Sequence, residues 1–246
     1  MTLEIAILVA AGFFVGGILK GATGAGAPLI SVPLLTLIYD APTAVALFAI
    51  PTLIPNIWQT WHFRKSRMPT GFVARFAGAG LLGTIIGTLF LANLPTDILS
   101  IGVAVAVLLY VGLKLIVPDW RLSYQRAYPL SGVAGGLAGI MQGATGISAP
   151  ISISFLNAMG LDREQFVPTI SSYFVVVAVS QIPTLLLFGI MTRELALLGC
   201  AALIPLLAGM PVGSWLARYI SAARFNQLIL LILGVIALRL LVAAVY

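Results

Sequence analysis

Residues 21–28 read Gly-Ala-Thr-Gly-Ala-Gly-Ala-Pro, and residues 143–150 read Gly-Ala-Thr-Gly-Ile-Ser-Ala-Pro. The two stretches are identical at six of eight positions, at an offset of 122 residues, and each interrupts a long apolar segment. Glycine and proline weaken or break a helix from within. We therefore predict two broken helices at corresponding places in two homologous halves, residues 1–120 and 125–246.

The repeat extends beyond the motif. Three further identities occur at the same offset, and a pair of glycines recurs after a shift of four: Gly17 with Gly139, Asp40 with Asp162, Gln59 with Gln181, and Gly83 and Gly87 with Gly209 and Gly213. Chance can supply scattered glycines, but not a matched motif at two corresponding interruptions. The pattern indicates one transmembrane domain built from two related halves.

The composition indicates that this chain is embedded in a lipid bilayer. Hydrophobic residues make up 61% of the 246 residues and charged residues only 8%, with a mean hydropathy of +1.12. Soluble proteins are about 45–50% apolar and roughly a quarter charged. A soluble enzyme, a nucleic-acid-binding protein and a disulfide scaffold are excluded. Cys200 is the single cysteine, and no catalytic or metal-binding motif is present, so we expect no enzyme activity, cofactor or metal.

Six apolar segments are long enough to cross the hydrocarbon core, which takes about 20 helical residues. They cover residues 41–61, 71–92, 97–117, 166–189, 195–217 and 225–245. Each half thus has three spanning helices and one broken segment, 4–38 or 130–160, which forms a hairpin or two short crossings. The sequence predicts an all-α polytopic membrane protein with eight to ten membrane segments.

Basic residues suggest the orientation, because they collect in cytoplasmic loops. The break after residue 61 is basic, and so is the central linker: Arg64, Lys65, Arg67, Arg75, Arg121 and Arg126. If the first broken segment enters and leaves on one side, Arg218 and Arg224 also lie inside and the halves have inverted topology. A single crossing would make the halves parallel and place that pair outside. We favour the inverted arrangement.

Transporters built from inverted repeats bind substrates near the midplane, at broken helices. Helix N-termini present unpaired N–H groups and a positive dipole end, which suit an anion. Hydroxyl and amide side chains beside the breaks add donors. The candidate substrate-binding residues are Lys20, Gly21, Thr23, Gly24, Gly26 and Gln59 in the first half, and Gln142, Gly143, Thr145, Gly146, Ser148 and Gln181 in the second.

Lys20 makes this predicted site asymmetric. It directly precedes the first motif within a membrane segment, where a charge is functional by default, and its counterpart is Gln142. The alternative is that Lys20 extends to the membrane interface, as long basic side chains do. Both interpretations are open at the level of sequence.

Acidic residues are confined to segment ends and loops by this layout: Glu4, Asp40, Asp97, Asp119, Asp162, Glu164 and Glu194. Proton relays normally use intramembrane acids or histidines. Moving one negative charge outward gains about 2.3 kcal/mol per 100 mV of inside-negative potential, so an anion exporter needs no coupling ion. Sodium bound by backbone carbonyls at the breaks stays an alternative.

The motif pair, the two-half layout, the length and the paired glycines 83/87 and 209/213 resemble the TauE/SafE-type sulfite exporter family. The resemblance covers essentially the whole chain. It implies a multi-pass transporter of the cytoplasmic membrane for sulfite, sulfoacetate or related organosulfonates.

Three hypotheses follow. The leading one is a secondary transporter that exports or facilitates a small sulfur anion through a midplane site at the two breaks. The second is a cation-coupled importer of an organic sulfonate or carboxylate. The third is a channel-like pore or a scaffold that transports nothing. The expected partners are the anion, the bilayer and, in the importer, a coupling ion; a homodimer is open.

Overall fold

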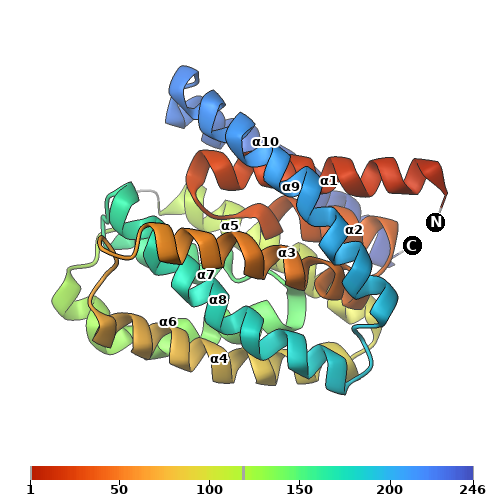
Figure 1. Ribbon diagram of the computed structural model, residues 1–246, viewed down its shortest axis with the longest axis horizontal. Coiled ribbons are helices and arrows are strands. Elements are labelled where there is room, and N and C mark those ends of the chain that lie inside the picture. Colours follow the sequence, from red (N-terminus) through yellow and green to blue (C-terminus); the bar gives the residue numbers. More distant parts are fainter. Residues whose placement is uncertain (1, 118–119, 246) are drawn as a thin grey trace.

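The computed structural model describes residues 2–117 and 120–245, and these form ten helices (Figure 1). In chain order they are α1 (Leu3–Thr23), α2 (Ala27–Ile38), α3 (Ala41–His62), α4 (Thr70–Asn93), α5 (Thr96–Ile116), α6 (Tyr124–Thr145), α7 (Ala149–Ala158), α8 (Arg163–Leu187), α9 (Arg193–Tyr219) and α10 (Ala222–Val245).

Six of these helices are long and apolar enough to cross a membrane: α1, α3, α4, α5, α8 and α9. The predicted all-α polytopic architecture is confirmed. Five of the six predicted spans correspond to α3, α4, α5, α8 and α9 within a few residues at each end. The sixth corresponds to α10.

The broken segments fold back on themselves, as in the hairpin form that the sequence left open, and Ser31 of α2 reaches back to the carbonyl oxygen of Gly12 on α1. Each consists of a long helix followed by a short one: 21 and 12 residues in α1 and α2, and 22 and 10 residues in α6 and α7. Each break falls inside the predicted motif, residues 21–28 or 143–150. The glycines that precede it stay helical because they lie against another helix. A Cβ atom at Gly21, for example, would overlap the carbonyl oxygen of Met210 on α9.

Two close helix pairs join the first half of the chain to the second. Helix α1 packs along α9 and α4 packs along α6, and both pairs are parallel. Added Cβ atoms at Gly17 and Gly83 would overlap the backbone oxygens of Leu206 and Gly136 across these contacts. Small residues let membrane helices approach closely, so that dispersion contacts replace the missing hydrophobic driving force.

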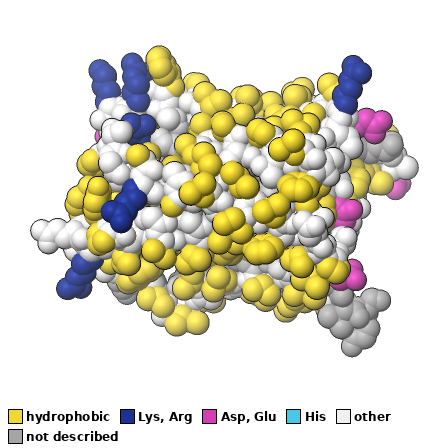
Figure 2. All heavy atoms as spheres, turned by 90° about the horizontal axis from the view of Figure 1, so that it is seen from below, with side chains coloured by type: hydrophobic (Ala, Val, Ile, Leu, Met, Phe, Trp, Pro, Cys, Tyr) yellow, Lys and Arg dark blue, Asp and Glu magenta, His cyan; other side chains and the backbone are white. Residues whose placement is uncertain are grey.

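Charged side chains gather at two opposite ends of the molecule, with a hydrophobic belt between them (Figure 2). We call the end with the 63–69 loop and the 120–123 linker the basic end. The opposite end, where α5 and α9 begin with Asp97 and Glu194 in their first turns, is the acidic end. Asp119 lies outside the described residues, as does the side chain of Arg224.

Candidate anion site at the broken helices

Glycine shapes the first break. Helix α1 ends at Gly24 with φ 86°, and α2 begins after Gly26 with φ 91°, a left-handed conformation that residues with a Cβ rarely adopt. A Cβ at Gly24 would also overlap the side chain of Val167 on α8. Pro28 lies in the first turn of α2, where its missing N–H costs nothing.

The second break has the same design with one difference. Helix α6 ends at Gly146 with φ 71°, but Ser148 before α7 has φ −102°, so its side chain is tolerated. An added Cβ at Gly146 would contact Val45 of α3 at 3.2 Å. At the 122-residue offset, this contact is equivalent to that between Gly24 and Val167. Each break therefore packs against a long helix of the other half.

Lys20 is buried beside the first break. Its side chain is 4% exposed, and Nζ donates a hydrogen bond of 2.8 Å to Oδ1 of Asn56 on α3. Ala27 and Phe174 line the same small cavity of about 10 Å³, which places the ammonium near the N-terminus of α2. Lys20 thus does not extend to the surface, and the structure excludes that alternative.

Arg163 covers the other helix end at this break. From the start of α8, its Nη1 and Nη2 donate to the carbonyl oxygens of Ala22 and Gly21 at 2.9 and 3.0 Å, and Ser214 Oγ also donates to Gly21. A cation at a helix C-terminus offsets the negative dipole end. Arg163 therefore offsets the negative dipole end of α1. The positive dipole end of α2 lies beside it, so the electrostatic field at the first break is positive.

The second break has no cation in the equivalent place. Gln142 Nε2 lies 3.4 Å from Oε1 of Gln181, and Gln181 Nε2 donates to the Gln142 carbonyl at 3.2 Å. Gln142 Oε1 is buried without a hydrogen-bond partner among the described residues. The two breaks thus differ chemically: one is cationic and the other carries neutral amides.

The threonine hydroxyls of the motif serve the helix ends. Thr23 Oγ1 donates to Leu19 O and Thr145 Oγ1 donates to Met141 O, each at 2.8 Å. Thr145 Oγ1 also accepts the backbone N–H of Ile147 at 3.2 Å. Thr23 is exposed whereas Thr145 is buried. These hydroxyls hold the geometry of the breaks, a role that the motif alone does not reveal.

The remaining predicted residues are dispersed around the two breaks. Gln59 Oε1 accepts a hydrogen bond of 2.9 Å from Ser171 on α8, and Ser148 Oγ accepts one of 3.2 Å from Ser152. Gly143 lies against the backbone of α4 in the α4–α6 contact. Gln59 is a side-chain amide near the first break, while Ser148 and Gly143 have packing roles at the second.

Two cavities reach the first break from the basic end. One, of about 320 Å³, is lined by Gly26, Tyr110 and Lys114 among others. The other, of about 400 Å³, is lined by Gly21 and Gln59 among others. Arg163 borders both cavities. A small molecule that enters from the basic end can therefore reach the first break. Lys20 itself lies in a separate small cavity behind it.

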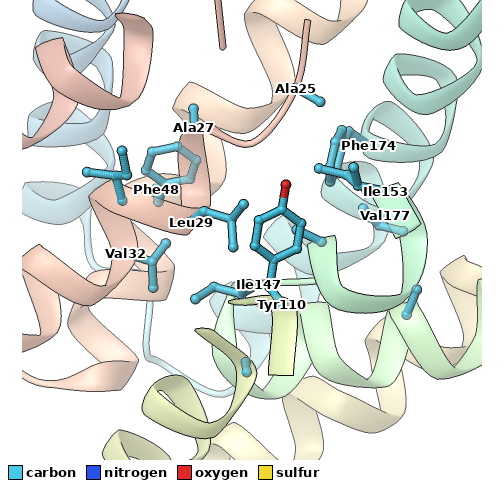
Figure 3. Close-up of a cluster of buried hydrophobic side chains, with 14 of the residues drawn as sticks. Ala25, Ala27, Leu29, Val32, Phe48, Tyr110, Ile147, Ile153, Phe174 and Val177 are labelled. Carbon is cyan, nitrogen blue, oxygen red and sulfur yellow. The ribbon is translucent and has the colours of Figure 1, made fainter. Parts of the chain in front are cut away.

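Figure 3 shows how the two breaks converge on one apolar cluster. Ala25 and Ala27 come from the first break and Ile147 from the second, and Tyr110 of α5 lies between them with its hydroxyl directed toward the side of Ala25. Neither Tyr110 nor Arg163 was predicted as a site residue. A comparison of the halves offers one signal for Arg163, because its counterpart at the offset is the uncharged Ala41.

The sequence model of the family described as sulfite exporter TauE/SafE matches residues 8–240, a range that contains both breaks. The chain belongs to this family. TauE/SafE proteins are membrane transporters, and membership indicates transport of sulfite or a related sulfur anion across a bilayer. The apolar helices make this TauE/SafE protein a multi-pass membrane protein. No curated protein and no solved structure is significantly similar to the chain.

Proposed function

We propose that this protein is a secondary carrier that binds sulfite or a small organosulfonate at the first break, where Lys20, Asn56 and the start of α2 meet. The observation that supports this proposal most directly is the buried Lys20 ammonium, whose one hydrogen-bond partner among the described residues is a neutral amide. A buried ion without a counter-ion costs several kcal/mol. A bound anion supplies that counter-ion and accepts the two remaining ammonium protons.

The second break contributes neutral donors in this proposal. Gln142 and Gln181 hold amide N–H groups in the core without adding charge. A monovalent anion then meets one strong cationic partner and weak neutral ones. Binding of this kind is tight enough for selection but weak enough for release, which a carrier needs.

The carrier consists of two inverted halves, residues 1–120 and 125–246, in which each break packs on the other half. The equivalent contacts of Gly24 and Gly146, and the reciprocal pairs α1–α9 and α4–α6, support this organisation. In Figure 1, α3 runs from the acidic to the basic end and α8 runs in the opposite direction, as inverted halves require.

The access route differs at the two ends. The cavity at the basic end is lined by Asn157, Arg163 and Phe166. Their counterparts at the 122-residue offset are Leu35, Ala41 and Ala44, each with 0% exposure. The positions equivalent to this cavity are therefore tightly packed near the acidic end. In this proposal the basic end lies on the cytoplasmic side of the inner membrane. The cavity then opens to the cytoplasm, where it can bind an anion for export.

Export requires no coupling ion in this scheme. Outward movement of one negative charge is favoured by about 2.3 kcal/mol per 100 mV. No acidic residue lines the small Lys20 cavity among the described residues. The membrane potential alone then suffices to drive the anion outward.

A second function, cation-coupled import, is favoured by one specific observation. Gln142 Oε1 is a buried oxygen that has no hydrogen-bond partner among the described residues, in a break that has Gln142 where the first has Lys20. Unwound backbone carbonyls at broken helices coordinate Na⁺ in other carriers, and this amide oxygen would add a further ligand.

Anion flux into proteoliposomes tests these functions. Sulfite, sulfoacetate, sulfate and acetate are compared under an imposed potential, with and without Na⁺ and a pH gradient. Saturable flux of a sulfur anion driven by potential alone supports the exporter. Strict dependence on Na⁺ or protons supports the importer instead. Flux that does not saturate indicates a pore, and absence of sulfur-anion flux refutes the proposal.

A further inference from the structure

The last two turns of α3 expose a continuous apolar ridge. It consists of Ile54, Ile57, Trp58 and Trp61, all exposed, with the two indole side chains 55% and 67% accessible. Their spacing places them on one face of the helix. At 1.5 Å per residue, this α3 ridge is about 10 Å long. It offers hydrocarbon chains a surface that ends in aromatic rings at the basic end of the molecule.

Cations follow the ridge directly. The sequence of residues 61–75 contains four basic residues and no acidic one, and the side chains of Arg64 and Lys65 are exposed. The guanidinium carbon of Arg64 lies 4.4 Å from the ring centroid of Trp61, and Nη1 donates a hydrogen bond of 2.9 Å to the Trp61 carbonyl oxygen. A guanidinium has five N–H donors. Arg64 is thus held over the last ring of the ridge with donors left for a further acceptor.

Ring contacts fix the shape of this surface. The rings of Trp58 and His62 stack with their centroids 4.9 Å apart, and the ring of Phe63 contacts both of them edge-on. Trp58 and Phe63 also line the 400 Å³ cavity that reaches Gly21. The end of the ridge is therefore preorganised, and it lies at the mouth of a cavity that leads to the first break.

The order of groups along this surface matches the order along an anionic phospholipid. Aliphatic side chains come first, then indole rings, then cations, as acyl chains, the glycerol region and the phosphate follow one another in the lipid. Tryptophan is enriched at the level of lipid headgroups. Basic clusters next to a membrane helix attract anionic lipids, and a guanidinium can bind two phosphate oxygens at once.

Charge also argues against a second copy of the chain as the occupant. Two copies inserted in the same direction would meet through the same patch, ridge against ridge. Arg64 and Lys65 of one copy would then lie beside their equivalents in the other, and the like charges would repel. An anionic lipid is complementary at both ends of the surface.

We propose that the α3 ridge, together with Arg64 and Lys65, is a binding site for an anionic phospholipid. The phosphate lies on the two cations, the headgroup region lies on Trp58 and Trp61, and an acyl chain follows the aliphatic part of the ridge. This inference goes beyond the proposed function and does not depend on it.

The experiment follows the fluorescence of Trp61 in the purified full-length protein in mixed micelles. Phenylalanine replaces the other three tryptophans, Trp58, Trp120 and Trp215. The probes are phosphatidylglycerol and phosphatidylcholine with brominated acyl chains, which quench an indole that they contact. Half-maximal quenching should need at least about fivefold less phosphatidylglycerol, the effect of one cation near an anionic surface.

Two double variants of this reporter protein test the cations. Arg64→Gln with Lys65→Gln should respond equally to both lipids. Arg193→Gln with Arg218→Gln removes two exposed cations outside the site and should keep the preference for phosphatidylglycerol. Because all four side chains are exposed, both double variants should unfold at the same temperature as the reporter protein.

Each other outcome overturns the proposal. Equal quenching of the reporter protein by the two lipids would show that the cations do not select a headgroup. Equal loss of preference in both double variants would indicate an effect of net charge alone. Competition by soluble glycerol 3-phosphate as strong as that by the lipid would assign the cations to a free phosphate. Absence of quenching in a protein that elutes as a dimer would mean that a second copy covers the ridge.

Discussion

Lys20 on α1 and Asn56 on α3 are joined by a hydrogen bond of 2.8 Å between buried side chains. The acceptor is an amide oxygen, so the ammonium is held in position without being neutralised. A carboxylate in the same place would form a closed ion pair and leave nothing for an anion to compensate. In the proposed function, the choice of amide over acid is thus what leaves this buried cation free to bind an anion.

The charge of the Asn56 partner can be changed with almost no change in shape. In Asn56→Asp the carboxylate should pair with Lys20 and compete with the substrate, lowering sulfite affinity at least tenfold while the fold is retained. Sulfite-dependent thermal stabilisation of the purified protein measures this. Asn93→Asp makes the same change at the exposed end of α4 and should be neutral. Wild-type sulfite affinity in Asn56→Asp would remove Lys20 from the site.

The positive charge itself is tested by Lys20→Met, which keeps a long unbranched stem in the core. The variant no longer buries an ion, so its thermal stability should equal or exceed that of the wild type. Sulfite flux in proteoliposomes should fall at least tenfold. Undiminished saturable flux would show that the second break or the α2 N-terminus binds the anion without Lys20.

Arg163 connects the electrostatics of the two helix ends. Arg163→Gln removes the cation from the C-terminus of α1, where such charges contribute about 0.3–2 kcal/mol, so both stability and sulfite affinity should decrease, the latter severalfold. Arg193→Gln removes an exposed charge at the start of α9 and is the matched control. Equal sulfite affinity in both variants would mean that the field at the first break does not depend on Arg163.

The existence of the breaks could be predicted from the sequence because Gly-Ala-Thr-Gly and Ala-Pro carry local conformational information. The helical conformation of the glycines before the first break could not. It depends on Gly17 and Gly21 packing on α9, and a glycine in isolation predicts helix weakening. A contact almost 200 residues away in the chain reverses that preference.

The candidate site shows the same difference between what local sequence reveals and what depends on contacts between distant segments. Lys20 and Gln142 stand out because a charge or an amide in an apolar segment is conspicuous. Asn56 was not among the predicted site residues, and the structure shows that its interhelical hydrogen bond is to Lys20. Arg163 reaches Gly21 across 142 positions, so no local pattern connects them. Side chains that act across distant segments become visible only in the fold.

The close helix pairs give a test of packing. A Cβ at Gly83 would overlap the Gly136 carbonyl oxygen on α6, whereas one at Gly78 on the same helix meets nothing within 4 Å. Gly83→Ala should therefore lower the midpoint of thermal unfolding, and Gly78→Ala should leave it unchanged or raise it through better helix propensity. Equal midpoints for the two variants would contradict the close α4–α6 contact.

The proposed inverted arrangement predicts which loops share a side of the membrane. With exposed Cys200 replaced by serine, single cysteines at Lys65 and Arg218 should react with a membrane-impermeant maleimide only from the cytoplasmic side. Cysteines at Asp97 and Arg193 should react only from outside. The reason is that each broken segment enters and leaves on one side, so the second half starts at the basic end. Labelling of positions 65 and 218 from opposite sides would mean parallel halves, and the two breaks could then no longer face one site from opposite directions.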